Sequence, residues 1–184
     1  MQMIMNWKSA GFVSAVTALI IGMCVLAGYA PPSAAGQKSQ LSAQDSQFLM
    51  KAAQGGIAEV KMGQVAVKQA EDENTKGLAH HIIKDHLAAN KKLMKLAGML
   101  DVQPPKQTDQ EHQQMIRQLA KKDTTLLDQT YIVEQIKGHK EMISIFQQEV
   151  KQGQNPQLVK FAKKTLPTLE EHLKMAQKLN PKTQ

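Results

Sequence analysis

Apolar residues recur at steps of three and four through four long segments of this chain, which is the period of one face of an α-helix. One of these stripes consists of Ile132, Ile136, His139, Ile143, Phe146 and Val150. Another consists of Leu158, Phe161, Thr165, Leu169, His172, Ala176 and Leu179. The strict alternation typical of strands is missing, so the sequence predicts an all-α fold whose stripes face a shared core.

The two earlier segments show the same period. Their stripes consist of Leu49, Ala52, Gly56, Glu59, Gly63, Ala66 and Ala70, and of Ala79, Ile82, Ile83, His86, Ala89, Leu93, Ala97 and Leu100. Each of the four stripes therefore carries one ionisable side chain at a position where an apolar one is expected. These residues are Glu59, His86, His139 and His172.

Start and stop signals set the expected helix bounds. Ser42 is a predicted N-cap with Asp45 three positions later, and Asn155 is another, followed by Pro156 at the first helical position. Gly153 is expected to stop the helix before it. The expected helices are about 42–71, 74–100, 109–121, 123–151 and 156–179, and the break between the second and third is DVQPPKQTDQ.

Two tight hairpins are thus joined by a long crossover that contains a short helix. A crossover of about 22 residues predicts a four-helix bundle of the kind that has one long connection, as ferritin-like folds do. We expect this bundle domain to span residues 42–180.

Residues 1–35 are expected to form a signal peptide or an N-terminal membrane anchor. Lys8 precedes an uncharged apolar run from Ala10 to Ala30, and cleavage near Ala35 would suit signal peptidase. The only cysteine, Cys24, lies inside this run, so a cleaved chain has no disulfide and no thiolate ligand. We expect a periplasmic or secreted protein, or one anchored to the inner membrane.

The charge of the chain bears on its partners. The net charge is +7, and the basic residues are spread over positions expected on solvated helix faces. An exported basic protein meets envelope lipids and polymers, and we expect contact with these through the basic faces. Aromatic residues make up only 4% of the chain, too few to form a stacking platform for bases, so we expect no nucleic-acid binding.

The four ionisable residues are expected to lie at one level of the bundle. Counted from the nearest turn, each lies about 20–27 Å along its helix, near the middle of helices about 40 Å long. Burying such groups without partners costs several kcal/mol, so they must satisfy one another, water or a metal ion. Three imidazoles and one carboxylate would accept zinc, copper, iron or manganese.

A proline lies one turn before the last of these histidines. Pro167 cannot donate a hydrogen bond to the carbonyl of Lys163, which predicts a bend in the helix that could turn His172 toward its partners.

Other residues are expected to surround the ligands and orient them. Thr168 lies four residues before His172, and Asn90 lies four residues after His86, which is within helical reach in each case. The acidic neighbours of these two histidines are about 100° around the helix and are expected at a helix interface or in solvent. The surrounding residues are therefore Asp85, Asn90, Thr168 and Glu171.

Two function classes remain open. The first is an envelope protein that binds a metal ion in the bundle core. The second is a non-catalytic stress-response or interaction bundle whose buried histidines fix the helix register or respond to acid. The chain shows no Ser, Cys and His set for nucleophilic catalysis and no glycine loop for phosphate, so an enzyme finds little support.

Four blocks of the sequence resemble a known family. FLMKAAQGGIAEVKMGQVAVKQA, IIKDHLAAN, YIVEQIKGHKEMISIFQQE and FAKKTLPTLEEHLKMA are similar to successive blocks of the bacterial domain-of-unknown-function family 4142, an exported ferritin-like group. The resemblance covers about residues 45–176. It implies a ferritin-like bundle and an envelope location, and no established activity. The family's recurrent positions fall here on Glu59, Asp85, His86, His139, Pro167 and His172.

One departure from the wider ferritin-like pattern is clear. Di-iron bundles carry Glu-x-x-His on two helices, whereas Ile83 precedes His86 and Leu169 precedes His172 by three residues. This argues against di-iron oxidase chemistry and favours a mononuclear or a purely structural site.

Overall fold

The computed structural model describes residues 41–180, and within them it has five helices and no strand. The helices are α1 (Ala43–Gln69), α2 (Glu73–Met99), α3 (Gln110–Leu119), α4 (Thr124–Gln152) and α5 (Pro156–Leu179). The expected all-α class and the expected order of helices are confirmed. The segment predicted to be a signal peptide or anchor, residues 1–35, lies outside the described residues. Among residues 41–180, no helix is long and apolar enough to cross a membrane.

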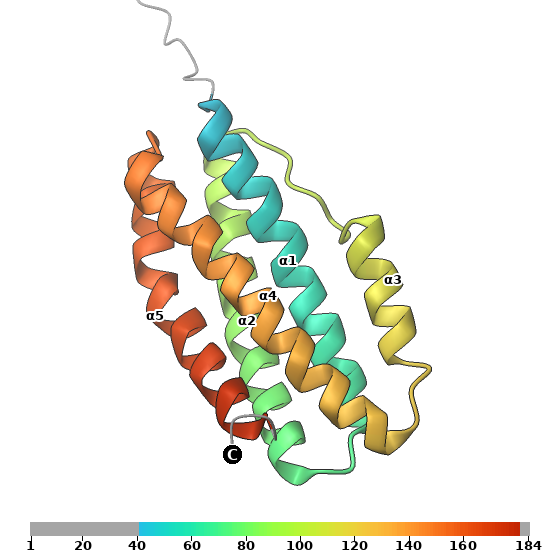
Figure 1. The fold of residues 1–184 in the computed structure, drawn as a ribbon. Helices are drawn as coiled ribbons and strands as arrows, with labels where there is room; N and C mark the ends of the chain where they lie inside the picture. The colour runs from blue at the N-terminus through green and yellow to red at the C-terminus, as the bar shows by residue number, and fades with distance from the viewer. Residues whose placement is uncertain (1–40, 181–184) are drawn as a thin grey trace, which may run out of the picture. The chain divides into compact units, whose positions relative to one another are not determined.

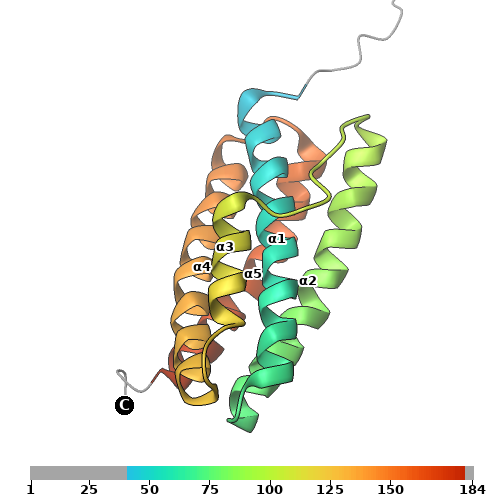
Figure 2. The same cartoon turned by 90° about the vertical axis from the view of Figure 1, so that its right-hand side faces the viewer.

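Four long helices lie side by side, and α3 lies outside them (Figures 1 and 2). Helix α1 packs against α2 and α4, and α5 packs against α4 and α2. Helices that follow one another through tight turns run in opposite directions, as the colours of Figure 1 show. Helix α3 packs mainly on α1 and only weakly on α4.

The helix starts follow the capping residues. The Ser42 hydroxyl accepts a hydrogen bond from the Asp45 backbone N–H and donates one to the Asp45 carboxylate, which stabilises the first turn of α1. The Asn155 side chain accepts from two backbone N–H groups of α5, and Pro156 occupies the first turn. Both predicted caps are confirmed.

The core has two apolar halves. We call one the phenylalanine half, because Phe48, Phe146 and Phe161 pack there with ring centroids 4.9–6.3 Å apart. The other is the tyrosine half, in which Tyr131 is fully buried among aliphatic residues. On every long helix the predicted ionisable residue lies between the positions that enter the two halves. The four stripes therefore place their polar members at one level.

Glycines on α1 allow the neighbouring helices to come close. A Cβ atom on Gly63 would lie 2.7 Å from Cγ1 of Ile83, and one on Gly56 would clash with the amide of Asn90. Small residues at these positions thus set the spacing between α1 and α2 in the layer where the polar side chains meet.

Helix α5 continues through its internal proline, from Pro156 to Leu179 without interruption. The bend that Pro167 is expected to cause stays a prediction.

Candidate metal centre

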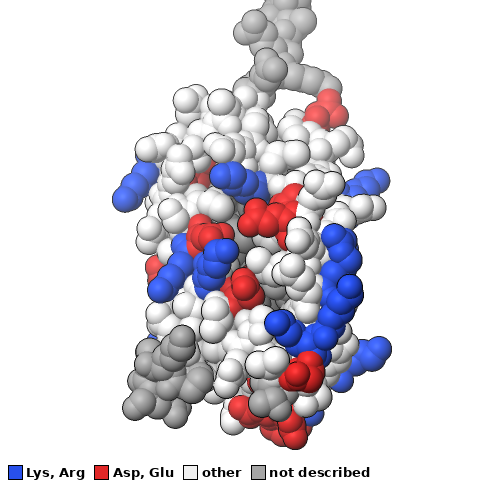
Figure 3. All heavy atoms as spheres, turned by 45° about the vertical axis from the view of Figure 1, so that its right-hand side comes forward, with Lys and Arg blue, Asp and Glu red and all other residues white. Residues whose placement is uncertain are grey.

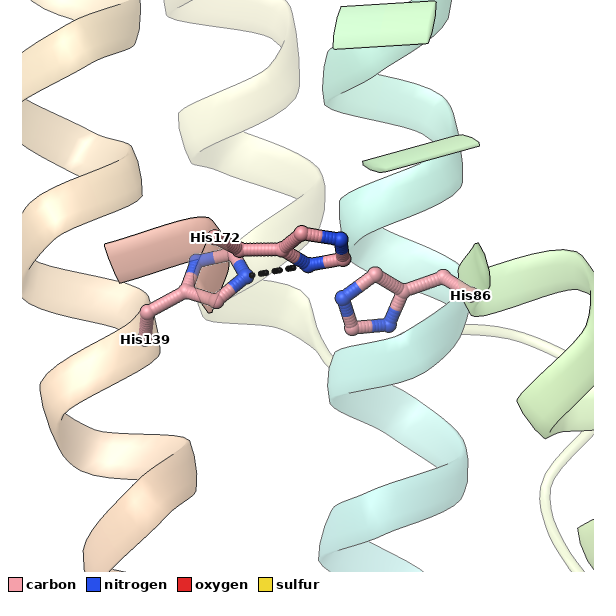
Figure 4. Close-up of side chains that lie close together, drawn as sticks. All are labelled: His86, His139 and His172. Atoms are coloured by element: carbon pink, nitrogen blue, oxygen red, sulfur yellow. Dashed lines mark hydrogen bonds between the residues drawn. The ribbon is translucent and has the colours of Figure 1, made fainter. Parts of the chain in front are cut away.

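Three histidines from three helices meet in the layer between the two apolar halves. His86 of α2, His139 of α4 and His172 of α5 are 5%, 1% and 2% exposed. Their ring centroids are 5.3–5.7 Å apart, and one nitrogen from each ring lies within 4.8 Å of the others. Figure 4 shows the rings turned toward one another across the core. We call these three residues the histidine cluster.

The outer nitrogens of two rings are held by acceptors. His139 Nδ1 lies 3.0 Å from the backbone carbonyl oxygen of Gln135, and His172 Nε2 lies 3.1 Å from Oδ2 of Asp85. A carbonyl and a carboxylate can only accept, so each of these nitrogens must carry the proton. This fixes the tautomers of the two neutral rings, with a lone pair on the remaining nitrogen of each.

Those two lone pairs face each other. His139 Nε2 and His172 Nδ1 are 3.3 Å apart, although neither neutral ring has a proton left to place between them. The third ring adds another unmatched nitrogen, because Nε2 of His86 is buried without a hydrogen-bond partner. Figure 4 shows a nitrogen of His86 turned toward the ring of His172. The two rings with fixed tautomers thus face each other with electron pairs and without a proton between them.

A metal ion would resolve this arrangement. Nitrogen ligands about 2.0–2.1 Å from a tetrahedral zinc ion are about 3.3–3.4 Å from one another. The separation of 3.3 Å between His139 Nε2 and His172 Nδ1 matches one edge of such a tetrahedron. The third nitrogen lies within 4.8 Å, so it needs to move by at most about 1.5 Å to complete the same geometry.

The electrostatics keep the rings neutral. Burial and the other two histidines lower the pKa of His86 well below its ordinary range. Burial lowers the pKa of His139 to about 4, although the Gln135 carbonyl raises it. Burial and His139 also lower the pKa of His172, against the raising effect of Asp85. Neutral imidazole is the form that binds metals, so the cluster is prepared to do so at neutral pH.

The carboxylate of Glu59 is not part of the histidine cluster. Glu59 lies at the same level and is 4% exposed, but the group of mutually close metal-binding atoms among the described residues contains only the three histidines. Its Oε2 accepts a hydrogen bond from Gln135 Nε2 at 2.8 Å. Burial raises the pKa of Glu59 to about 7, although the Gln135 hydrogen bond lowers it. Glu59 as a ligand stays a prediction.

Of the residues expected around the ligands, Asp85 contacts one, as the acceptor for His172. It is 39% exposed and sits on the neighbouring helix α2, which is the expected helix-interface position. Glu171 is exposed, and Asn90 and Thr168 are half-buried. Within residues 41–180, hydrogen bonds join none of these three to the rings of the cluster, so their orienting role stays a prediction.

Sequence reasoning missed Gln135, which connects two of the predicted residues. Its backbone carbonyl accepts from His139, and its side chain donates to Glu59. Gln135 is fully buried although it lies one position before Ile136 of the stripe. Its spacing of four residues from His139 was the available signal.

Sequence reasoning also missed a second buried polar region, which we call the acid pair. Asp45, at the start of α1, accepts hydrogen bonds from the backbone N–H groups of Gln154 and Asn155 through Oδ1. Glu149, near the end of α4, is fully buried, and burial together with Asp45 raises its pKa to about 7. These contacts fasten the turn between α4 and α5 to the start of α1.

Comparison with known proteins gives a family and a fold. A family model described as "Domain of unknown function (DUF4142)" matches residues 30–179. A solved structure entitled "Crystal structure of DUF305 fragment from Deinococcus radiodurans" superposes with a TM-score of 0.67 at 12% identity. The match covers 76% of this chain and 96% of that one, and at this identity it shows a shared fold alone. No curated protein matches the chain.

Proposed function

The chain belongs to the DUF4142 family, a domain of unknown function, and we propose that its helical bundle binds one transition-metal ion through His86, His139 and His172. The observation that carries this proposal is the pair of lone-pair nitrogens of His139 and His172, 3.3 Å apart in the buried core. The unpartnered Nε2 of His86 supports it. Asp85 and the Gln135 carbonyl would orient two of the ligands.

Three imidazoles leave one position of a tetrahedral ion open. This donor set suits zinc, and also copper, iron or manganese, all of which accept imidazole. The proposed set omits the predicted ligand Glu59, because Gln135 already engages its carboxylate. An open position allows an added ligand such as water, but the geometry supports binding without pointing to a reaction.

Metal titration of the purified protein tests this proposal. We expect one zinc or cobalt ion per chain, and the cobalt form should show the strong visible absorption of a tetrahedral ion. His139→Ala and His172→Ala should each lose the metal. His81→Ala is the matched control, because His81 is exposed and should leave the stoichiometry unchanged. A metal-free wild type, or full occupancy in both core variants, would contradict the proposal.

One observation favours a second function. The lowered pKa values mean that acid would drive protons into a packed core, as in a bundle that responds to acid. In that case the protein is a non-catalytic stress-response or interaction bundle, and the histidines are structural. A metal-free wild type that loses stability in His139→Ala and His172→Ala would support this alternative.

We extend the proposal to the class of bundle and its location. The four long helices with one long connection support a ferritin-like four-helix bundle. Lys8 and the apolar run from Ala10 to Ala30 support export, with the bundle in the periplasm, secreted or anchored to the inner membrane. A mass measurement of the mature protein tests cleavage near Ala35. Basic helix faces would then contact envelope lipids or polymers.

A further inference from the structure

A cavity of about 280 Å³ opens beneath α3, between that helix, α1 and α4. It is separate from the histidine cluster, none of whose residues line it. Its lining includes Lys51, Glu59, Glu111, His112, Gly138 and Glu141. The weak packing of α3 on α4 leaves this space open.

The floor of the cavity is a carboxylate that is only half satisfied. Glu59 is 4% exposed, and its Oε2 accepts from Gln135. Its Oε1 has no hydrogen-bond partner among the described residues. This oxygen lies beside Gly138, where a Cβ atom would be 3.1 Å away, so the missing side chain leaves room above it. This oxygen is not fully buried, so a donor in the cavity can reach it.

Acidic side chains surround the opening. Asp109 is already paired with His112 at 2.8 Å, which leaves Glu59, Glu111 and Glu141 in the lining against the single lysine Lys51. Figure 3 shows acidic side chains, with basic ones among them, around a hollow on the side of the molecule where α3 lies. On a chain with a net charge of +7, this is a local excess of negative charge. The cavity therefore favours a cation.

The lining also limits what kind of cation fits. Within residues 41–180, the only group of at least three His, Cys, Asp or Glu side chains close enough to hold a metal is the histidine cluster. The acidic groups of the cavity are thus too far apart to enclose a bare ion. Met142 and Ile145 add apolar surface to the lining. A short alkyl chain with a positive group at each end matches a lining that is both acidic and apolar.

We propose that the cavity between α1, α3 and α4 binds a small aliphatic diamine. One ammonium group donates to Oε1 of Glu59, the methylene groups contact Met142 and Ile145, and the second ammonium lies among the acidic side chains of the rim. The raised pKa of Glu59, about 7, fits a carboxylate that is stabilised when a cation arrives.

Calorimetric titration with 1,4-diaminobutane tests this proposal on the full chain. We expect saturable binding of one diamine per chain, and weaker binding of butylamine, which lacks the second charge. Glu59→Gln should lower the affinity at least tenfold, because the amide has no charge to offer. Glu170→Gln is the matched control, since Glu170 is exposed on α5 and should leave binding unchanged.

A second variant guards against a folding defect in Glu59→Gln. Gly138→Val places a side chain against Oε1 of Glu59 and should also weaken diamine binding. His172→Ala should lose metal and keep the diamine, so the two sites can fail independently. Absence of saturable binding, or an unchanged affinity in both Glu59→Gln and Gly138→Val, would overturn the proposal. Binding of Mg²⁺ in place of the diamine would do the same.

Discussion

The histidine cluster and the acid pair are both polar, both buried and both formed by several helices. They differ in whether their hydrogen-bond acceptors find donors. In the acid pair, the oxygens of Asp45 meet donors from the chain itself, namely two backbone N–H groups and the Ser42 hydroxyl, although Oε1 of the neighbouring Glu149 is buried without a partner. In the histidine cluster, acceptor meets acceptor between His139 and His172. The contrast is therefore between two facing acceptors with no donor between them, which a cation would join, and the Asp45 carboxylate, whose donors come from the chain itself.

The largest effect is expected when Asp45, the acid that holds the turn between α4 and α5, is removed. Asp45→Ala leaves two backbone N–H groups near Gln154 without their acceptor and removes a partner of the α1 cap, so we expect a loss of about 3 kcal/mol in unfolding free energy. Asp72→Ala is the control, because it removes an exposed cap and should cost about 1 kcal/mol. Urea denaturation measures both.

Metal binding should be untouched by that loss of stability. The folded fraction of Asp45→Ala should still take one ion per chain, since the acid pair contributes no ligand. Loss of metal from folded Asp45→Ala would show that the acid pair and the histidine cluster are coupled. The acid pair could then no longer be regarded as purely structural.

The next effect concerns the histidine cluster itself. A ligand that binds only the folded state stabilises it by about 2.7 kcal/mol when its concentration is 100 times the dissociation constant. We therefore expect added zinc to raise the unfolding free energy of the wild type by this amount at that ratio. The same addition should leave His172→Ala unchanged, and thermal or urea unfolding with and without chelator measures the difference.

A smaller effect separates the loss of stability that the buried histidines cause in the metal-free protein from the metal binding that they provide. Nε2 of His86 is buried without a partner, and such an orphan group costs about 1–3 kcal/mol. We expect His86→Leu to raise the stability of the metal-free protein by roughly 1 kcal/mol, while it removes the stabilisation by zinc. A metal-free His86→Leu that is much less stable than the wild type would indicate that the histidine is structural.

The apolar stripes predicted the level of the site in the bundle but not the hydrogen bonds between its side chains. The period of each helix shows which face is buried, so Glu59, His86, His139 and His172 could be placed in one layer from the sequence. It does not show which partner a side chain meets once inside, and the carboxylate of Glu59 meets the Gln135 amide and is not part of the group formed by the three rings.

The helical periodicity of the sequence did not predict contacts between distant segments. The Asp45 carboxylate meets the backbone of Asn155 across 110 positions, and that contact depends on the geometry of a turn. Asp45 had a sufficient local explanation as part of the α1 cap, so nothing in the sequence marked it as a long-range partner. The acid pair could only be found in the structure.

The smallest change is expected in the pH dependence, because the two regions oppose each other there. The histidine cluster has lowered pKa values, so its contribution to stability is lost as pH falls from 6.5 toward about 4, the pKa of His139. Glu149 has a pKa raised from 4.5 to about 7, so stability is lost as pH rises through that window. Between pH 4.5 and 6.5 the two slopes partly cancel.

Glu149→Gln removes one of these slopes. The unfolding free energy of the variant should therefore rise more steeply with pH between 4.5 and 6.5 than that of the wild type, because the histidine slope is less opposed. Urea denaturation of metal-free protein at several pH values measures the slopes, with Glu170→Gln as an exposed control. Equal slopes in wild type and Glu149→Gln would mean that Glu149 stays ionised in the folded protein, and the acid pair would then hold two charges.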